Sequence, residues 1–268
     1  MSGENVIVVK IGGSTLGSHD TTLEDVVALQ RQGWRPVVVH GGGAAISEWL
    51  EVMEETPARF VRGLRVTDAR SLRVVVAVLA GLINKELVAG ISALGGRAIG
   101  LSGADGGLIR VRRLDPELGY VGQIERVDAD LLARLFDAGY LPVVAPLGLL
   151  WENQGPQNQI LNINADTVAG EVAAALEAQW LVFLTDVPGI SGHDGSPLAR
   201  LSCPEAAALI DEGTVSGGMI PKVEACIRAC EGGSRTAIID GRQLYALLAA
   251  VQHGELAGTI IGQPEGLP

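Results

Sequence analysis

Residues 37–44 read Val37-Val38-Val39-His40-Gly41-Gly42-Gly43-Ala44, a β-branched run that stops at three glycines and continues as a helical pattern. Such a run predicts a buried strand, and the glycines predict a tight passage from the strand into a helix. Consecutive glycines weaken an ordinary turn because each loses much backbone entropy on folding. Their presence therefore favours anion binding by backbone N–H groups at the helix N-terminus.

The same succession occurs near the start of the chain, where Val8-Val9-Lys10-Ile11 precedes Gly12 and Gly13. Glycines there let backbone N–H groups approach phosphate oxygens, and Lys10 adds a positive charge. The spacing G-x-x-x-x-G-K of a Walker A loop is absent from this segment. Taken alone, the segment fits a phosphate site and an ordinary tight turn equally well.

Strand-like runs alternate with helical patterns along the rest of the chain. The strand-like runs are residues 6–11, 36–39, 98–101, 141–145, 181–185, 236–239 and 259–261. The helical patterns are residues 23–32, 44–54, 69–94, 128–138, 166–175, 203–211, 220–231 and 243–252. This alternation predicts an α/β fold with a parallel sheet covered by helices on both faces. Residues 147–159 are the least periodic and predict a loop or short hairpin, and residues 193–196 predict a turn.

Composition narrows the classes of partner. The chain has 268 residues, of which 47% are hydrophobic and 19% charged, so it folds rather than remaining disordered. Its net charge of −11 disfavours binding to nucleic acid or to anionic membranes. The longest apolar run, residues 74–83, is much shorter than the roughly 20 residues that span a bilayer. We therefore expect neither nucleic acid nor a membrane as a partner.

The three cysteines, Cys203, Cys226 and Cys230, are too few for a disulfide framework. We interpret them as reduced thiols of a cytoplasmic protein. Cys226 and Cys230 are one helical turn apart, a spacing that two metal ligands can have, but neither a histidine nor a third cysteine is near. Buried small apolar residues are the better interpretation, and no metal site of the protein itself is predicted.

The helical pattern at residues 69–94 is apolar on every side over residues 74–80. A helix that is apolar all round is buried all round. One face can pack on the sheet while the other meets a second copy of the chain, which predicts a homodimer. Complete burial within one subunit is the alternative.

Several polar residues stand where strands or turns meet helices. Arg62 and Arg65 precede a helical pattern, and either can grip a carboxylate with two parallel hydrogen bonds, although a solvated surface arginine is the simpler interpretation. Asn162, Asn164 and Asp166 alternate, so in extended backbone they face one way. Asp166 or Thr167 can also serve as a helix cap.

Lys222 lies in the first turn of a predicted helix, after Ser216-Gly217-Gly218-Met219-Ile220-Pro221. A cation is mildly unfavourable near a helix N-terminus unless it faces an anion. This position therefore suggests a bound anion, although a single exposed lysine costs little.

Taken together, these segments resemble the amino acid kinase family, and within it most closely the acetylglutamate kinases of arginine biosynthesis. The matching segments, in family order over nearly the whole chain, are Lys10-Ile11-Gly12-Gly13, His40-Gly41-Gly42-Gly43, Gly63-Leu64-Arg65-Val66-Thr67, Asn84-Lys85-Glu86-Leu87-Val88, Asn162-Ile163-Asn164-Ala165-Asp166, Leu184-Thr185-Asp186-Val187-Pro188-Gly189 and Gly217-Gly218-Met219-Ile220-Pro221-Lys222-Val223-Glu224. One departure is Ala44-Ala45-Ile46-Ser47, where the family more commonly has a proline, an acidic residue and an asparagine.

The resemblance implies a three-layer αβα sandwich with an open, mainly parallel central sheet. Residues 1–176 would form an N-terminal lobe for the acyl amino acid and dimerisation, and residues 177–268 a C-terminal lobe for the nucleotide. The implied reaction moves the γ-phosphoryl group of ATP, carried with Mg²⁺, to the side-chain carboxylate of N-acetyl-L-glutamate.

The resemblance also implies roles for individual residues. Lys10 and Lys222 would stabilise charge on the transferring phosphoryl group, and Asp166 would hold both lysines. Backbone N–H groups of Gly12, Gly13 and Gly42 would hold phosphate oxygens. Contacts to the acyl amino acid would come from Gly42, Gly43, Arg65 and Asn162. Nucleotide contacts would come from Asp186, Val187, Pro188, Gly189, Ile190, Ser191, Thr214, Val215 and Ser216.

Two alternatives stay open at this point. A kinase of the lysine pathway acts on an N-blocked aminoadipate, which is one methylene longer, and one methylene changes specificity by only about 1–3 kcal/mol. The net charge of −11 disfavours docking of an acidic carrier protein. A catalytically silent regulatory relative is the other alternative, although Lys10, Asp166 and Lys222 are all present.

Overall fold

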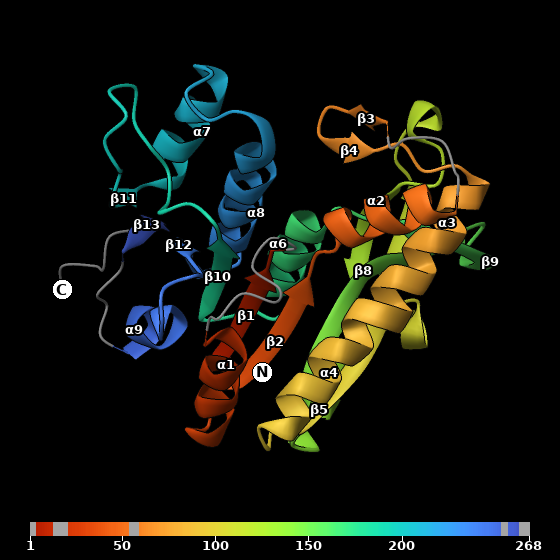
Figure 1. Cartoon of the computed structure of the whole chain (residues 1–268), viewed down its shortest axis with the longest axis horizontal. Coiled ribbons are helices and arrows are strands. Elements are labelled where there is room, and N and C mark those ends of the chain that lie inside the picture. The colour runs from red at the N-terminus through yellow and green to blue at the C-terminus, as the bar shows by residue number, and fades with distance from the viewer. Residues whose placement is uncertain (1–3, 13–20, 54–58, 253–256, 263–268) are drawn as a thin grey trace. The chain divides into compact units, whose positions relative to one another are not determined.

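The computed structural model describes residues 4–12, 21–53, 59–252 and 257–262, which form two compact units (Figure 1). Unit 1 comprises the described parts of residues 1–37 and 169–268, and unit 2 those of residues 38–168. The chain crosses between them within β2 (Arg35–His40) and within α6 (Ala165–Ala175). This division differs from the boundary expected at residue 176, because the first strand pairs with strands from the C-terminal part of the chain.

Unit 1 is built on strands in the order β11-β13-β12-β10-β1. Their bounds are β1 (Val6–Ile11), β10 (Trp180–Thr185), β11 (Arg200–Leu201), β12 (Arg235–Asp240) and β13 (Gly258–Ile261). The helices are α1 (Thr22–Arg31), α7 (Cys203–Asp211), α8 (Ile220–Glu231) and α9 (Ala246–Gln252). All neighbouring strands are parallel except β12 and β13. Every residue of β1 and β10 is buried, as expected for parallel strands covered on both faces.

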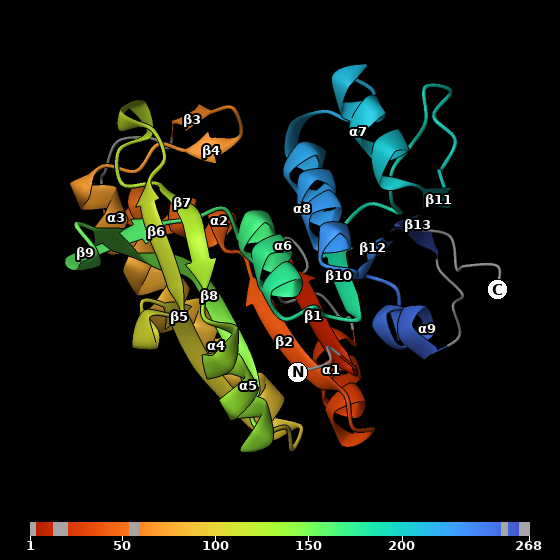
Figure 2. The ribbon, with the colours of Figure 1, turned by 180° about the vertical axis from the view of Figure 1, so that it is seen from behind.

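Unit 2 is centred on the long strand β8 (Leu141–Glu152), which is parallel to β2, β5 and β6 and antiparallel to β9. The other strands are β3 (Phe60–Val61), β4 (Leu64–Arg65), β5 (Ala98–Gly103), β6 (Ile109–Arg113), β7 (Gly122–Val127) and β9 (Gly155–Asn162). The helices are α2 (Gly43–Val52), α3 (Ala69–Val76), the π-helical segment η1 (Ala77–Ile83), α4 (Asn84–Ala93) and α5 (Ala129–Asp137). In Figure 1 the α3–η1–α4 helix lies in front of β5 and β8, and in Figure 2 α5 lies on the other side of these strands. The expected α/β class, with helices on a mainly parallel sheet, is confirmed.

The long helix at Ala69–Ala93 was expected as one continuous helix, and the structure shows a π-helical segment in its middle. By length and composition this helix is apolar enough to cross a membrane, with a mean hydropathy of 2.0 over its most apolar window. Its second half packs on β5 and β8, and the buried Asn84 donates hydrogen bonds to the strand carbonyls of Val143 and Leu101. These contacts identify it as the core helix of unit 2.

The region that was expected as a loop or short hairpin is a longer hairpin than predicted. Strand β8 continues to Glu152 and β9 begins at Gly155, so only Asn153 and Gln154 form the turn. Both have positive φ, +51° and +64°, which is the conformation that tight two-residue hairpin turns require. The expected turn at residues 193–196 is confirmed, because Gly192 N donates to Ser196 O.

A buried carboxyl group lies between two helices of unit 1. Asp25 in α1 is only 1% exposed, and its Oδ2 accepts a hydrogen bond of 3.4 Å from Leu248 N in the first turn of α9. Burial raises the pKa of Asp25 to about 6, and the hydrogen bonds from α9 oppose this only in part. The contact therefore holds α9 on α1 at a cost whenever the carboxyl group is ionised.

We predict that Asp25→Asn stabilises the chain near neutral pH. The folded-state pKa of Asp25, about 6, lies above its ordinary value. Its contribution to stability is thus complete below about pH 4 and is lost as the pH rises through about 6. The variant should raise the free energy of unfolding at about pH 7.5 by roughly 1–3 kcal/mol, with the gain vanishing below about pH 4. Denaturant unfolding at about pH 7.5 and below about pH 4 measures this free energy, and Asp211→Asn, at an exposed position, is the control. An equal gain in the free energy of unfolding at both pH values would contradict the prediction.

Candidate functional site

The carboxyl ends of three parallel strands meet at one edge of the unit 1 sheet. Ile11 of β1 pairs with Leu184 of β10, and Leu184 pairs with Ile239 of β12. Beyond the strands, Gly12 N donates to Leu184 O and Gly241 N donates to Thr185 O. Ligands of open α/β sheets bind at this edge. Lys10, which is 6% exposed, lies in β1 just before it, whereas Gly13 lies outside the described residues.

The segment after β10 packs on the buried Thr259. Gly189 has φ +123°, and a Cβ there would lie 2.6 Å from Thr259 Oγ1, so only glycine fits. Ile190 N donates to the same Oγ1 at 2.8 Å. Asp186, Val187 and Pro188 are left exposed, and Ser191 is exposed after Ile190. The expected nucleotide segment is thus anchored at its glycine and open to solvent at both ends.

A histidine connects the two segments that were expected to contact a nucleotide. His193 follows the first segment, and its Nδ1 lies 2.8 Å from Thr214 Oγ1 in the second. Its Nε2 lies 3.1 Å from Glu212 Oε2. Val215 is buried and anchors the second segment, while Ser216 is exposed. Sequence reasoning treated His193 only as part of a turn, because its partners lie about 20 residues further along the chain.

Two further charged groups lie near this edge. Lys222 is in the first turn of α8, as expected, and its Nζ donates to Gly218 O at 3.1 Å. Asp240, at the end of β12, accepts two hydrogen bonds from the Arg242 guanidinium, at 2.8 and 2.7 Å, and one from Arg242 N, at 3.0 Å. This pairing holds the pKa of Asp240 below its usual range. This pair was not predicted, because the Asp240-Gly241 dipeptide at the strand end indicates a turn but not an arginine partner.

In unit 2, Gly42 and Gly43 have different surroundings. A Cβ on Gly42 would lie 2.5 Å from Ile83 Cδ1 and 2.7 Å from Leu79 Cδ2, so Gly42 permits close packing on η1. A Cβ on Gly43 would meet no described atom within 4 Å. Gly43 begins α2 and faces open space, which leaves room for a ligand at the helix N-terminus.

Arg65, on β4, is buried beside this glycine segment. It is 8% exposed, and its Nη2 donates to Gly43 O and to Ser47 Oγ, each at 2.9 Å. Its guanidinium lies 4.9 Å from the ring centre of Phe60. Its Nη1 is buried and has no hydrogen-bond partner among the described residues. Burial lowers the pKa of this arginine, so an anion at Nη1 would compensate a real desolvation cost.

The residue pattern alone left Arg62 and Arg65 as equal candidates for binding a carboxylate, and only the family resemblance singled out Arg65. Arg62 and Gly63 form the turn between β3 and β4, with φ of +50° and +77°. Arg62 is exposed at that turn, whereas Arg65 points to the glycine segment.

Asn162 joins the same cluster through Thr67. Asn162 Nδ2 donates to Thr67 Oγ1 at 3.2 Å, and Thr67 Oγ1 donates to Arg65 O at 3.0 Å. The structure therefore brings together Gly43, Arg65 and Asn162, all expected to contact the acyl amino acid. The expected cap of α6 was wrong: Asn164 Oδ1 accepts from Asp166 N and Thr167 N at 2.7 and 3.2 Å, which leaves Asp166 buried in the first turn.

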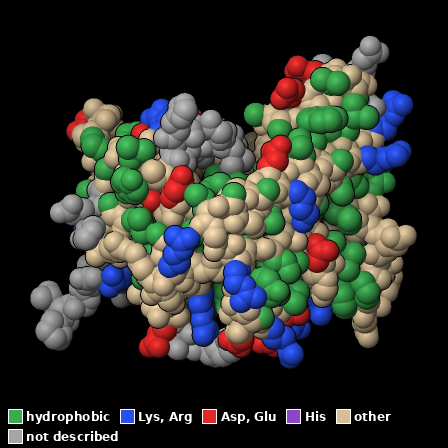
Figure 3. Space-filling view, turned by 60° about the horizontal axis from the view of Figure 1, so that its bottom comes forward, with side chains coloured by type: hydrophobic (Ala, Val, Ile, Leu, Met, Phe, Trp, Pro, Cys, Tyr) green, Lys and Arg blue, Asp and Glu red, His purple; other side chains and the backbone are tan. Residues whose placement is uncertain are grey.

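Neither the charged side chains on the face drawn in Figure 3 nor the metal-binding side chains of the described residues form one dominant cluster. On the face drawn in Figure 3, acidic and basic side chains are interspersed rather than gathered by sign. Within residues 4–12, 21–53, 59–252 and 257–262, no three His, Cys, Asp or Glu side chains are grouped to hold a metal ion. The groups expected to face an anion remain the backbone N–H groups of the glycine segments, Lys10, Lys222 and Arg65.

Comparison with known proteins gives consistent similarities. Residues 5–240 match the amino acid kinase family. An acetylglutamate kinase from Dehalococcoides mccartyi is 43% identical over 263 residues, which cover 98% of this chain and 96% of the relative. The smu.665 protein of Streptococcus mutans has a similar structure, with a TM-score of 0.83 at 29% identity, covering 96% of this chain and 98% of that one.

A further solved structure is similar but longer. The N-acetylglutamate synthase of Neisseria gonorrhoeae, solved with coenzyme A and N-acetyl-glutamate, matches with a TM-score of 0.81 at 27% identity. The match covers 99% of this chain and 61% of that protein.

The two glycines make a matched pair for substitution. We predict that Gly42→Ala lowers the free energy of unfolding by about 1–3 kcal/mol, because the methyl group overpacks against Leu79 and Ile83. Gly43→Ala should change it by less than about 0.5 kcal/mol, because its methyl group enters open space. Denaturant unfolding of both variants measures the difference. Equal losses would contradict the packing role assigned to Gly42.

Proposed function

We propose, because this chain belongs to the amino acid kinase family, that it transfers the γ-phosphoryl group of MgATP to the side-chain carboxylate of N-acetyl-L-glutamate. The product would be an acyl phosphate and the activity a step of arginine biosynthesis. The name and 43% identity of the Dehalococcoides mccartyi relative, over nearly the full length of both chains, support this substrate.

The observation that carries the proposal is the guanidinium of Arg65. It is buried, its Nη2 donates to neutral oxygens of Gly43 and Ser47, and its Nη1 has no hydrogen-bond partner among the described residues. A buried cation in this situation favours an anionic ligand that can accept from it. A carboxylate of acetylglutamate suits this position, with Asn162 and the α2 N-terminus beside it.

The proposed chemistry requires no general base. The attacking carboxylate is ionised at neutral pH, so one of its oxygens bonds to the γ-phosphorus while the bond from phosphorus to the β–γ bridging oxygen breaks. ADP leaves with that electron pair. Catalysis then depends on positioning and on charge stabilisation, for which Lys10 and Lys222 are the proposed groups, with Asp166 as their positioning residue.

Nucleotide binding is proposed at the carboxyl edge of β1, β10 and β12. Support comes from Gly12 at the end of β1, from the exposed residues 186–188, and from the connection of this segment to Thr214 through His193. Residues 177–268 would thus supply most nucleotide contacts, and residues 1–176 those to the acyl amino acid. MgATP is the phosphoryl donor, with Mg²⁺ carried by the nucleotide.

We further propose a homodimer and a cytoplasmic location. The helix at Ala69–Ala93 leaves apolar side chains such as Leu82 exposed beside its buried face, which supports contact with a second copy. The free thiols of Cys203, Cys226 and Cys230 suit a reducing compartment.

An acyl-phosphate trapping assay tests the function. Hydroxylamine converts an acyl phosphate to a hydroxamate, so the wild-type chain with MgATP should yield hydroxamate from acetylglutamate. Its kcat/KM should exceed that for acetylaminoadipate by about 10- to 200-fold, because the extra methylene has to be accommodated. A reversed ratio would favour the lysine-pathway alternative. No trapped product with either substrate would favour a silent relative.

Substitution of Arg65 tests acyl amino acid recognition. Arg65→Ala should raise KM for acetylglutamate by about 10- to 100-fold, because a charge-assisted hydrogen bond contributes about 1.5–3 kcal/mol. KM for MgATP should change less than about twofold, and Arg62→Ala, at the exposed turn, should behave as wild type. Steady-state kinetics with each substrate varied measures this. A change confined to KM for MgATP would refute the assignment.

The two lysines test charge stabilisation. Lys10→Ala and Lys222→Ala should each lower kcat by at least about 10²-fold, the usual loss when a preorganised group facing a developing anion is removed. Arg134→Ala, which removes an exposed cation from α5, is the control and should keep normal kcat. Near-normal turnover in either lysine variant would show that its assigned role is wrong.

A further inference from the structure

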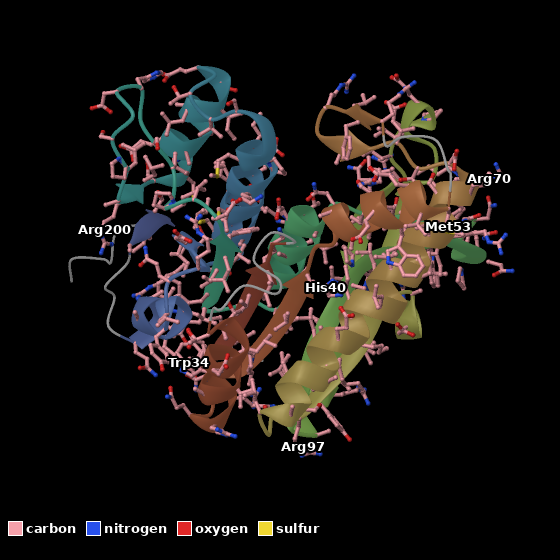
Figure 4. The ribbon with its side chains drawn as sticks, in the orientation of Figure 1. Trp34, His40, Met53, Arg70, Arg97 and Arg200 are labelled. Carbon is pink, nitrogen blue, oxygen red and sulfur yellow. The ribbon has the colours of Figure 1, made fainter. Side chains whose placement is uncertain are left out.

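A buried histidine and a buried asparagine lie beneath the glycine segment of unit 2. His40, the last residue of β2, and Asn84, the first residue of α4, are both 0% exposed. His40 Nδ1 is 2.9 Å from Gly41 O, and its Nε2 is 3.3 Å from Asn84 Nδ2. Figure 4 marks His40 next to the long helix. The chemistry proposed above uses neither side chain.

These hydrogen bonds determine how the Asn84 amide is oriented and which ring nitrogen of His40 is protonated. Asn84 Oδ1 accepts from Lys85 Nζ at 2.9 Å, so the amide nitrogen faces Val143 O, at 2.9 Å, and His40. Gly41 O can only accept, so His40 Nδ1 carries a proton. In the neutral ring Nε2 then accepts from Asn84 Nδ2.

The pair is held from several sides. The two N–H groups of Asn84 Nδ2 serve three acceptors, Val143 O on β8 at 2.9 Å and Leu101 O on β5 and His40 Nε2 at 3.3 Å each, so at least one N–H group is shared. At Gly100 on β5 a Cβ would overlap Asn84 Oδ1 and would lie 2.6 Å from Lys85 Nζ. The position of the Asn84 amide is therefore set by two strands and the start of α4. His40 extends this support to the glycine segment.

The hydrogen bond to Gly41 O bears directly on the Gly42 N–H group. Gly41 C=O and Gly42 N–H belong to one planar trans peptide, so they point in opposite directions. Glycines on both sides make this peptide easy to rotate, because neither residue has a Cβ to restrict φ and ψ. Holding Gly41 O on His40 directs Gly42 N–H away from the imidazole and opposes rotation of the peptide.

We propose that His40, supported by Asn84, is a positioning residue that sets the orientation of the Gly41–Gly42 peptide for binding a phosphoryl oxygen. The inference rests on the proposed function, which assigns the Gly42 N–H group to that oxygen. Other residues restrict the rest of the glycine segment. Leu79 and Ile83 restrict the Cα of Gly42, and Arg65 holds the carbonyl of Gly43. The Gly41 carbonyl group, the Cα of Gly42 and the Gly43 carbonyl group thus each have a separate support.

Three substitutions at His40 separate positioning from packing. In His40→Asn the amide nitrogen takes the place of Nδ1 and can still donate to Gly41 O. In His40→Gln the amide reaches only the place of Nε2, and in His40→Leu no donor remains. The proposal expects kcat within about threefold of wild type for Asn, and about 10- to 100-fold lower for Gln and Leu, the loss typical of one misaligned donor. KM for acetylglutamate should change much less than kcat.

Thermal unfolding of each variant provides the structural comparison. Thr236→Val, which removes a buried hydrogen bond of 2.8 Å to Ile261 O in unit 1, should lower Tm while keeping wild-type kcat. If the three His40 variants have equal kcat, or if kcat falls in step with Tm, the positioning role is overturned. If His40→Leu does not fold, the comparison of Asn with Gln decides.

A readout without catalysis keeps this inference separate from the proposed function. Amide hydrogen exchange of the Gly42 N–H group should be altered by His40→Gln and restored towards wild type by His40→Asn. Identical exchange in both variants would overturn the positioning role. Failure of the wild-type chain to form any acyl phosphate would overturn the proposed function instead, whatever the exchange shows.

Discussion

Parallel strands that are buried on both faces disfavour charged side chains along their length, because burying an unpaired charge is costly, and this constraint decides where the chemistry of the chain can lie. Every residue of β1 and β10 is buried, and β8 is buried at nearly every position up to Leu150. The charged and glycine-rich segments are consequently found at or beyond strand ends. This rule applies to Lys10, Gly12, Asp186, Asp240 and the His40–Gly43 segment.

Sequence reasoning succeeded where burial produces a strong local pattern. The strands at residues 6–11, 181–185 and 236–239 were recognisable as short continuous apolar runs, and the main helices because apolar residues recur with the helical period. The hairpin β3–β4 was not predicted because each strand has only two residues, and the pair β6–β7 was not predicted because it is largely polar and partly exposed. The candidate site was recognisable as a set of segments, but the contacts between them were not.

Three details show why those contacts escaped prediction. Arg62 and Arg65 have equivalent sequence surroundings, and only the turn at Arg62 and Gly63 decides which of them is buried. His193 contacts Thr214 and Glu212, which follow β11 and α7 in the chain, and no local sequence pattern encodes this pairing. Asn164 was passed over as the cap of α6 in favour of its neighbours, although asparagine is among the best N-cap residues.

The π-helical segment η1 has a consequence for how the long helix tolerates change. Its seven residues wind more loosely than an α-helix, so α4 presents a different side to the sheet than a uniform 3.6-residue repeat would give. The stretch at residues 74–80, which is apolar on every side, is not buried on every side within one chain, because Ala77 is exposed. Loss or gain of one residue within Ala77–Ile83 has to be absorbed by a change in this winding, because otherwise Asn84 and the rest of α4 would turn away from the strands that they contact. The length of this segment, and not only its hydrophobicity, is therefore a requirement of the fold.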